Sequence, residues 1–138
     1  MPANPVTKPL KILVVEDCVD TQDLLSYVLQ AEGMQVDVVG DGRACIETAL
    51  GAAERNHPYS AIVMDMGLPD ADGLTVTRNL RLQGYEHPIF AVTIEPSLGK
   101  RAESLHAGCD GFLAKRTIQH TLRYALEDLS RQPSRVSY

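Results

Sequence analysis

The chain alternates between short apolar runs and segments whose apolar residues recur every three or four positions. The runs are apolar at most positions, which is typical of strands buried in a sheet. The expected strands are Leu10–Val15, Met34–Val39, Ala61–Met64, Ile89–Val92 and Phe112–Ala114. A helical segment follows each run. Because parallel strands are joined by right-handed crossovers, the pattern predicts an α/β fold with a five-stranded parallel sheet of order 2-1-3-4-5, covered on both faces.

Capping and turn residues set the expected ends of the helices. Helices are expected to start at Asp20, Asp41, Asp72 and Thr117. Helix stops are expected at Gly33, near Gly84 and before Gly108. The apolar positions that mark the fourth helix are Leu98, Ala102 and Leu105.

Composition and charge narrow the possible functions. The 138 residues fit one domain over residues 10–130, with a flexible lead at 1–9 and a short tail at 131–138. The net charge is −5 and no run of Lys or Arg occurs, which argues against a direct nucleic-acid partner. No apolar segment is long enough to span a membrane, and the N-terminus does not resemble a signal peptide. We expect a cytoplasmic monomer or weak dimer without membrane contact or an output domain.

Polar side chains follow four of the five expected strands. Glu16 and Asp17 follow the first strand. Asp65 follows the third strand, Thr93 follows the fourth, and Lys115 follows the fifth. The carboxyl ends of parallel strands meet at one edge of a sheet, so these side chains are expected to converge there. Three crowded carboxylates repel one another, and a hard divalent cation with oxygen ligands, such as Mg²⁺, relieves the repulsion.

The expected site suits phosphoryl transfer. A metal ion, the Lys115 ammonium and the Thr93 hydroxyl around Asp65 would stabilise phosphoryl oxygens. A carboxylate can itself be the nucleophile, and Asp65 suits that role because both positive charges flank it. Asp17 is expected to hold the metal directly, and Glu16 through water.

Each of these residues also has an ordinary structural explanation. Glu16 and Asp17 could cap a helix, Asp65 could occupy a turn, and Lys115 could face solvent. No single position is persuasive. Four such positions at four strand ends of one sheet edge coincide far less readily by chance, which favours the functional interpretation.

Together these motifs resemble the receiver domain of response regulators in two-component signalling, over about residues 10–130. The matching stretches are Val-Val-Glu-Asp at 14–17, Ile-Val-Met-Asp-Met-Gly-Leu-Pro-Asp-Ala-Asp-Gly at 62–73, Ala-Val-Thr at 91–93 and Gly-Phe-Leu-Ala-Lys at 111–115. The resemblance implies a flavodoxin-like three-layer fold. It also implies a signalling domain rather than an enzyme, which takes a phosphoryl group onto Asp65 from a phosphohistidine of a histidine kinase or histidine phosphotransfer protein.

The same resemblance implies further roles. The protein ligands of Mg²⁺ would be Glu16, Asp17, Asp65 and the backbone carbonyl of Gly67. Thr93 and Phe112 would be switch residues that move inward after phosphorylation. The surface formed by helix four, strand five and helix five would then change its partner preference. Phe112 could instead be a plain core aromatic.

The middle of the chain is similar to receivers appended to hybrid sensor histidine kinases. This similarity is carried by Thr-Arg-Asn-Leu-Arg at 77–81, Gln-Gly-Tyr-Glu-His-Pro-Ile at 83–89 and His-Ala-Gly-Cys-Asp-Gly at 106–111. Two residues depart from the family. Ile94 stands where a small residue is usual, and we expect it to narrow access to the pocket and alter the rates of phosphorylation and dephosphorylation. Arg116 stands where proline is usual after Lys115, and a trans peptide is expected because a cis bond before a non-proline costs about 2.5–4 kcal/mol.

Two other functions compete with a phosphoaccepting domain. A phosphatase or mutase with an aspartyl nucleophile has a second Asp two residues later, and Gly67 occupies that position here. A degenerate receiver that only binds partners is the other alternative. The retained acidic pair, Asp65, Thr93 and Lys115 weigh against it.

Overall fold

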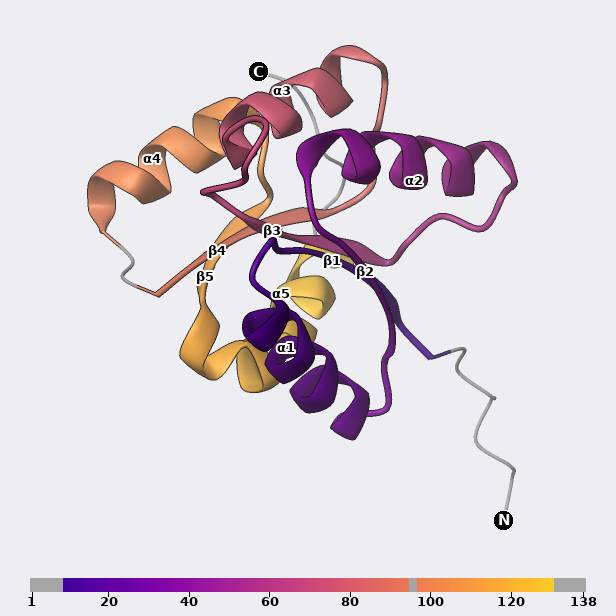
Figure 1. Cartoon of the computed structure of the whole chain (residues 1–138), viewed down its shortest axis with the longest axis vertical. Coiled ribbons are helices and arrows are strands. Elements are labelled where there is room, and N and C mark those ends of the chain that lie inside the picture. Colours follow the sequence, from indigo (N-terminus) through magenta and orange to yellow (C-terminus); the bar gives the residue numbers. More distant parts are fainter. Residues whose placement is uncertain (1–8, 95–96, 131–138) are drawn as a thin grey trace.

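The computed structural model describes residues 9–94 and 97–130, which form a three-layer α/β structure (Figure 1). The strands are β1 (Lys11–Val15), β2 (Gln35–Val39), β3 (Ala61–Asp65), β4 (Ile89–Thr93) and β5 (Gly111–Ala114). All pairings are parallel, in the order β2-β1-β3-β4-β5. The predicted fold class and strand order are confirmed. Most of the expected lead and the whole expected tail lie outside the described residues.

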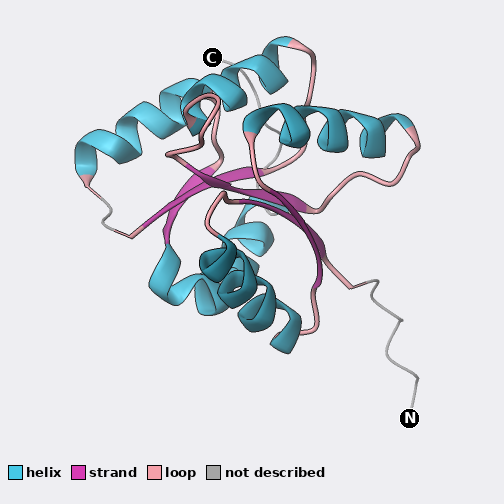
Figure 2. Ribbon diagram, in the orientation of Figure 1, coloured by secondary structure: helices cyan, strands magenta, loops and turns pink. Residues whose placement is uncertain are grey.

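Five helices flank the sheet. They are α1 (Val19–Ala31), α2 (Gly42–Glu54), α3 (Gly73–Leu82), α4 (Leu98–Ala107) and α5 (Ile118–Ser130). Helices α1 and α5 cover one face, and α2, α3 and α4 cover the other, with the strands between the two layers (Figure 2). In the described part of the chain, no helix combines the length and apolarity needed to cross a membrane.

The sheet separates two hydrophobic cores. Side chains alternate along β1, so Ile12 and Val14 belong to the core under α1 and α5. Leu13 and Val15 belong to the core under α2 and α3. All four are at most 1% exposed. Because β1 is buried on both faces, its packing fixes the position of the backbone from which Glu16 and Asp17 follow.

Most of the predicted helix ends are confirmed. The Asp41 side chain accepts a hydrogen bond from the amide of Ala44 at 2.7 Å, and Asp72 accepts one from Thr75 at 2.7 Å. These are N-cap bonds, which satisfy amides that have no partner inside the helix. Gly108 has a φ of +113° at the end of α4. Gly33 follows α1 with a φ of +84°, a left-handed conformation that glycine adopts without strain.

The predicted start of α1 is wrong. The N-cap is Cys18, whose carbonyl accepts the hydrogen bond of the Gln22 amide at 2.8 Å. Asp20 lies inside the first turn. A carboxylate there still faces the positive end of the helix dipole, so an acidic residue near a helix start does not by itself identify the cap.

The predicted face of α4 is also wrong. Leu98 is 87% exposed and Leu105 is 44% exposed, and Ala102 is exposed as well. The buried residues of α4 are Ser104 and Ala107. The Ser104 hydroxyl donates to the Lys100 carbonyl at 2.8 Å, which satisfies it inside the protein. Small side chains let α4 pack closely on β5 and leave its leucines in solvent.

The start of α5 differs from the expectation that Thr117 caps it. Residues Lys115–Thr117 form a turn of 3₁₀-helix that runs directly into α5. Thr117 therefore belongs to a helical turn, and its carbonyl accepts the Thr121 hydroxyl at 3.2 Å. This turn places the residues after β5 in a compact connection.

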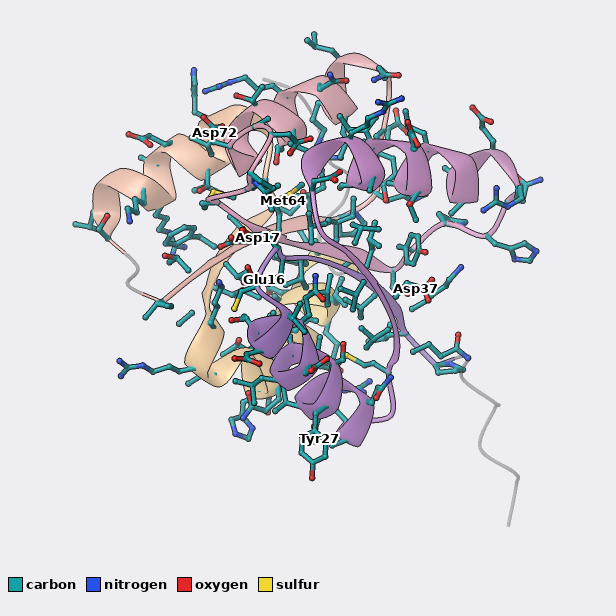
Figure 3. The ribbon with its side chains drawn as sticks, viewed as in Figure 1. Glu16, Asp17, Tyr27, Asp37, Met64 and Asp72 are labelled. Carbon is teal, nitrogen blue, oxygen red and sulfur yellow. The ribbon has the colours of Figure 1, made fainter. Side chains whose placement is uncertain are left out.

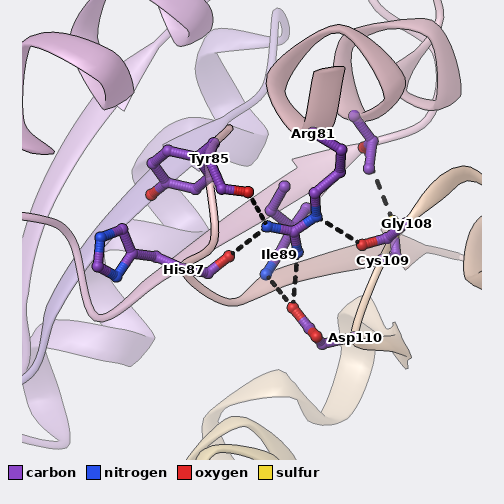
Figure 4. Close-up of polar contacts among 8 residues, drawn as sticks. Arg81, Tyr85, His87, Ile89, Gly108, Cys109 and Asp110 are labelled. Carbon is purple, nitrogen blue, oxygen red and sulfur yellow. Dashed lines mark hydrogen bonds and ion pairs between the residues drawn. The ribbon is translucent and has the colours of Figure 1, made fainter. Parts of the chain in front are cut away.

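A half-buried arginine, Arg81, joins α3 to the amino ends of β4 and β5 (Figure 4). Arg81 Nη2 lies 2.9 Å from Asp110 Oδ2, which also accepts the Ile89 amide at 2.9 Å. The guanidinium also donates hydrogen bonds to the carbonyl oxygens of Tyr85, His87 and Gly108, at 2.7, 2.9 and 2.9 Å. The side chains of Arg81 and Asp110 are 18% and 7% exposed. This fork holds the start of β4 next to the start of β5.

Replacing Arg81 tests this role. We expect Arg81→Met to lower the free energy of unfolding by about 3 kcal/mol, because it leaves the Asp110 carboxylate buried without its cation. Urea denaturation measures the change. Arg43→Met is the control: Arg43 and Glu47 form an exposed ion pair at 3.0 Å, whose loss costs less than about 1 kcal/mol. Equal losses in the two variants would contradict the prediction.

Candidate functional site

The strand register brings the predicted site residues to one edge of the sheet. Neighbouring strands pair Val15 with Met64, Asp65 with Val92, and Thr93 with Ala114. Glu16 and Lys115 are the first residues after β1 and β5. Figure 3 shows Glu16 and Asp17 beside Met64, where β1 and β3 end. The expected convergence at the carboxyl ends of the strands is therefore observed.

Three carboxylates form a cluster at this edge. Glu16, Asp17 and Asp65 can each present an oxygen such that these atoms lie within 4.8 Å of one another. Glu16 is 2% exposed, Asp65 is half-buried and Asp17 is exposed. Carboxylate oxygens suit Mg²⁺, which prefers oxygen ligands and usually keeps several waters. The donor set and its open, solvent-facing side fit that ion.

Lys115 lies against two of these carboxylates. Its Nζ is 2.6 Å from Glu16 Oε1 and 3.1 Å from Asp65 Oδ1. Burial alone would lower the pKa of Lys115. The hydrogen bond to Glu16 and the charge of Asp65 outweigh burial, so the pKa lies above its ordinary value of 10.5. Lys115 therefore carries a full positive charge beside Asp65 at neutral pH.

Glu16 is held by the protein through both its side chain and its backbone. Besides the contact with Lys115, Glu16 Oε2 accepts the Cys18 amide at 3.4 Å. The Gln22 side chain donates to the Glu16 carbonyl at 2.6 Å. The sequence interpretation missed Gln22, because a polar residue on a helix is usually solvent-facing. These contacts fix the Glu16 carboxylate in place beside Asp65.

The loop after β3 wraps closely around Asp65. The Gly73 amide donates to the Met66 carbonyl at 2.9 Å, and Gly67 forms an antiparallel bridge with Asp72. A Cβ at Gly73 would lie 2.6 Å from the Asp65 carbonyl oxygen, which only glycine avoids. Gly67 is exposed on this loop. Its carbonyl remains a predicted metal ligand.

Thr93 and its neighbour occupy the end of β4. Thr93 is half-buried, one residue beyond the Val92 that pairs with Asp65. Ile94 is 61% exposed. Its effect on access to the pocket stays a prediction, which the lifetime of a phosphorylated domain carrying Ile94→Ala would test; an unchanged lifetime would refute it.

Along the chain, Phe112 precedes Lys115 by three residues and Arg116 follows it directly. Phe112 is 8% exposed and packs in the core under α2 and α3. This burial agrees with a core aromatic, and its role as a switch stays a prediction. Within residues 9–94 and 97–130 there is no cis peptide bond, so the peptide before Arg116 is trans as expected.

A family model described as the response regulator receiver domain matches residues 12–127. The chain belongs to this family. The receiver domain is similar to the transcriptional regulatory protein PmrA of Pectobacterium parmentieri, with 34% identity over 106 residues, 77% of this chain and 46% of that protein. It is also similar to the response regulator MprA of Mycolicibacterium vanbaalenii, with 36% identity over 121 residues, 88% of this chain and 47% of that protein. The chain thus spans about half the length of these curated relatives.

Solved receiver structures share the fold. The receiver domain of the sensor histidine kinase PA1611 from Pseudomonas aeruginosa PAO1 is 32% identical, with a TM-score of 0.73 over 88% of this chain and 97% of that chain. That structure holds a magnesium ion in its active-site cleft. The chemotaxis protein CheY4 of Vibrio cholerae is 28% identical, with a TM-score of 0.74 over 88% of this chain and 98% of that chain. Receiver domains bind Mg²⁺ at an acidic pocket, and the acidic cluster described here matches that requirement.

The ion pairs of Lys115 predict a pH-dependent contribution to stability. In metal-free buffer we expect Lys115→Met to lower the free energy of unfolding by about 2 kcal/mol, because the buried Glu16 loses its cation. The loss is smaller than for a fully buried ion pair because Lys115 is partly solvent-exposed. The folded-state pKa of Lys115 is raised. Its contribution is therefore fully present below the unfolded-state pKa and is lost as pH rises through the folded value.

The measurement is urea denaturation across the alkaline range. The difference between wild type and Lys115→Met should stay constant from neutral pH and shrink only above about pH 10.5. Lys100→Met, at an exposed position of α4, is the control and should differ little from wild type. A difference between wild type and Lys115→Met that disappears near neutral pH would argue against the proposed ion pairs.

Proposed function

We propose that the receiver domain accepts a phosphoryl group on Asp65 from the phosphohistidine of a histidine kinase or histidine phosphotransfer protein. The observation that carries the proposal is the placement of Lys115 Nζ 3.1 Å from Asp65 Oδ1, within a cluster of three carboxylates. A nucleophilic carboxylate between a fixed cation and a metal-binding cluster is the arrangement that phosphoryl transfer requires.

The proposed ligands of Mg²⁺ are oxygens of Glu16, Asp17, Asp65 and the Gly67 carbonyl. Asp17 is exposed and free to bind directly. Glu16 already contacts Lys115, which supports a role through water. The ion would neutralise charge on the phosphoryl oxygens and orient them. The relative from Pseudomonas aeruginosa, which holds magnesium in its cleft, supports the proposal.

In the proposed step, an Asp65 carboxylate oxygen attacks phosphorus. A P–O bond forms as the P–N bond to histidine breaks, and the products are an acyl phosphate and a neutral imidazole. The imidazole either already carries a proton on its other ring nitrogen or takes one from water. Lys115 stays protonated because its pKa is raised, and it stabilises the charge on the phosphoryl oxygens. The Thr93 hydroxyl can then donate a hydrogen bond to the same group.

The proposed readout is a change in the surface of α4, β5 and α5. Thr93 ends β4, and Phe112 lies one strand away in β5. An inward shift of Thr93 toward a phosphoryl group would change how α4 presents its exposed Leu98 and Leu105. We place this exchange in the cytoplasm, where the free thiols of the chain would remain reduced. We propose the same donors, a histidine kinase or a histidine phosphotransfer protein, for any longer protein that contains this domain.

A degenerate receiver that only binds partners is the second candidate. The exposed Ile94 beside Thr93 is the observation that favours it. The contacts of Lys115 with Glu16 and Asp65 favour the phosphoaccepting function. Phosphorylation chemistry therefore separates the two.

The proposal predicts a covalent adduct. The whole chain, incubated with MgCl₂ and acetyl phosphate, should gain one phosphoryl group in its intact mass. Asp65→Asn should lose this adduct, because the amide is not a nucleophile. Asp72→Asn is the control, since asparagine can still cap α3 through the Thr75 amide. Absence of an adduct in the wild type, or its persistence in Asp65→Asn, would rule out the proposed acceptor.

A further inference from the structure

The connection between β3 and α3 is anchored to a second helix. Asp70, in the middle of this connection, accepts hydrogen bonds from the first two amides of α2: Gly42 N to Oδ1 at 2.8 Å and Arg43 N to Oδ2 at 3.0 Å. The two segments lie 27 and 28 positions apart in the chain. The loop that follows Asp65 is therefore tied to the start of α2 by one carboxylate.

The start of α2 is suited to hold this carboxylate. The first amides of a helix have no partner inside it, and the helix dipole favours a negative charge there. Asp41 takes the Ala44 amide at 2.7 Å, and Asp70 takes the two amides before it. The hydrogen bonds from Gly42 and then Arg43 lower the pKa of Asp70. The tether thus stays charged at neutral pH.

Close packing makes the tether short. Gly42 is buried, and a Cβ there would lie 2.6 Å from Val76 Cγ2 and 3.3 Å from Asp70 Oδ1. A side chain at position 42 would clash with Val76 of α3. Glycine therefore lets the first amides of α2 lie close to both α3 and the loop. The start of α2, the loop and the first turns of α3 are therefore in direct contact.

Gly67 depends on the loop for its position. Among the described residues, no heavy atom outside its chain neighbours lies within 4 Å of where a Cβ would stand at Gly67. On that side Gly67 therefore faces open space. Its backbone forms the bridge to Asp72, and three residues along the chain Asp70 fastens the same loop to α2.

We propose that Asp70 is a positioning residue for the metal and phosphoryl site. By tying the loop to α2, it fixes the arc of backbone that carries the Gly67 carbonyl next to Asp65. The inference rests on the proposed function, because it assumes that this carbonyl binds Mg²⁺. Residues that orient metal ligands without touching the metal change affinity when they are replaced.

The test compares two caps of the same helix. Isothermal titration of the whole chain with MgCl₂ should show that Asp70→Ala weakens binding about threefold to tenfold, the effect of losing one or two solvent-accessible hydrogen bonds. Asp41→Ala removes the Ala44 cap within α2 but leaves the tether, and its Mg²⁺ affinity should match the wild type. In metal-free protein, amide exchange at Gly42 and Arg43 should be faster in Asp70→Ala.

Asp70→Asn is the conservative variant. Its single amide oxygen can accept one of the two hydrogen bonds, so its Mg²⁺ affinity should fall between wild type and Asp70→Ala. It also serves as the test variant if Asp70→Ala does not fold. This graded response separates a tether from a general loss of stability, which Asp41→Ala also produces.

The outcomes distinguish this inference from the function on which it rests. If the wild type binds Mg²⁺ and the Asp70 variants bind it no more weakly than Asp41→Ala, the positioning role is wrong and the proposed function stands. If the wild type neither binds Mg²⁺ nor takes a phosphoryl group, both are wrong. Weaker binding in the Asp70 variants alone supports the tether.

Discussion

The crowding of three carboxylates at one sheet edge is the constraint on which the site depends. Charges of one sign that can approach within 4.8 Å of one another oppose folding unless positive charge offsets them. Within the described chain, Lys115 does this for Glu16 and Asp65, while Asp17 faces solvent. The receiver domain thus holds a carboxylate cluster whose oxygens suit a divalent cation, and the proposed phosphoryl group would lie beside Lys115 and that ion.

Features set by local chemistry could be predicted from the sequence. Apolar runs gave the strands because parallel strands inside an α/β sheet are buried, and the crossover rule then limited their order. Asp41 and Asp72 were recognisable as caps, since a short acidic side chain before a helix satisfies its free amides. Glu16 and Lys115 could be predicted to lie at the same edge of the sheet, because the carboxyl ends of parallel strands share an edge.

Features set by packing between distant segments could not be predicted from the sequence. Periodicity over the short helix α4 does not decide which side meets β5, and small side chains, Ser104 among them, were buried in place of the leucines. The Arg81 fork holds the amino ends of β4 and β5, at the other end of the sheet from Thr93 and Lys115. The contact of Asp70 with α2 joins segments that no local pattern connects.

The melting temperature of the whole chain against MgCl₂ concentration, measured beside Asp17→Asn, tests the role of the carboxylate cluster most directly. Mg²⁺ should stabilise the wild type, by about 2.7 kcal/mol at a concentration 100 times its Kd. With a chelator present, Asp17→Asn should melt above the wild type because one repelling charge is gone, and it should gain less from Mg²⁺. A wild-type Tm that does not respond to Mg²⁺, together with an Asp17→Asn variant no more stable than wild type in chelator, would contradict the account.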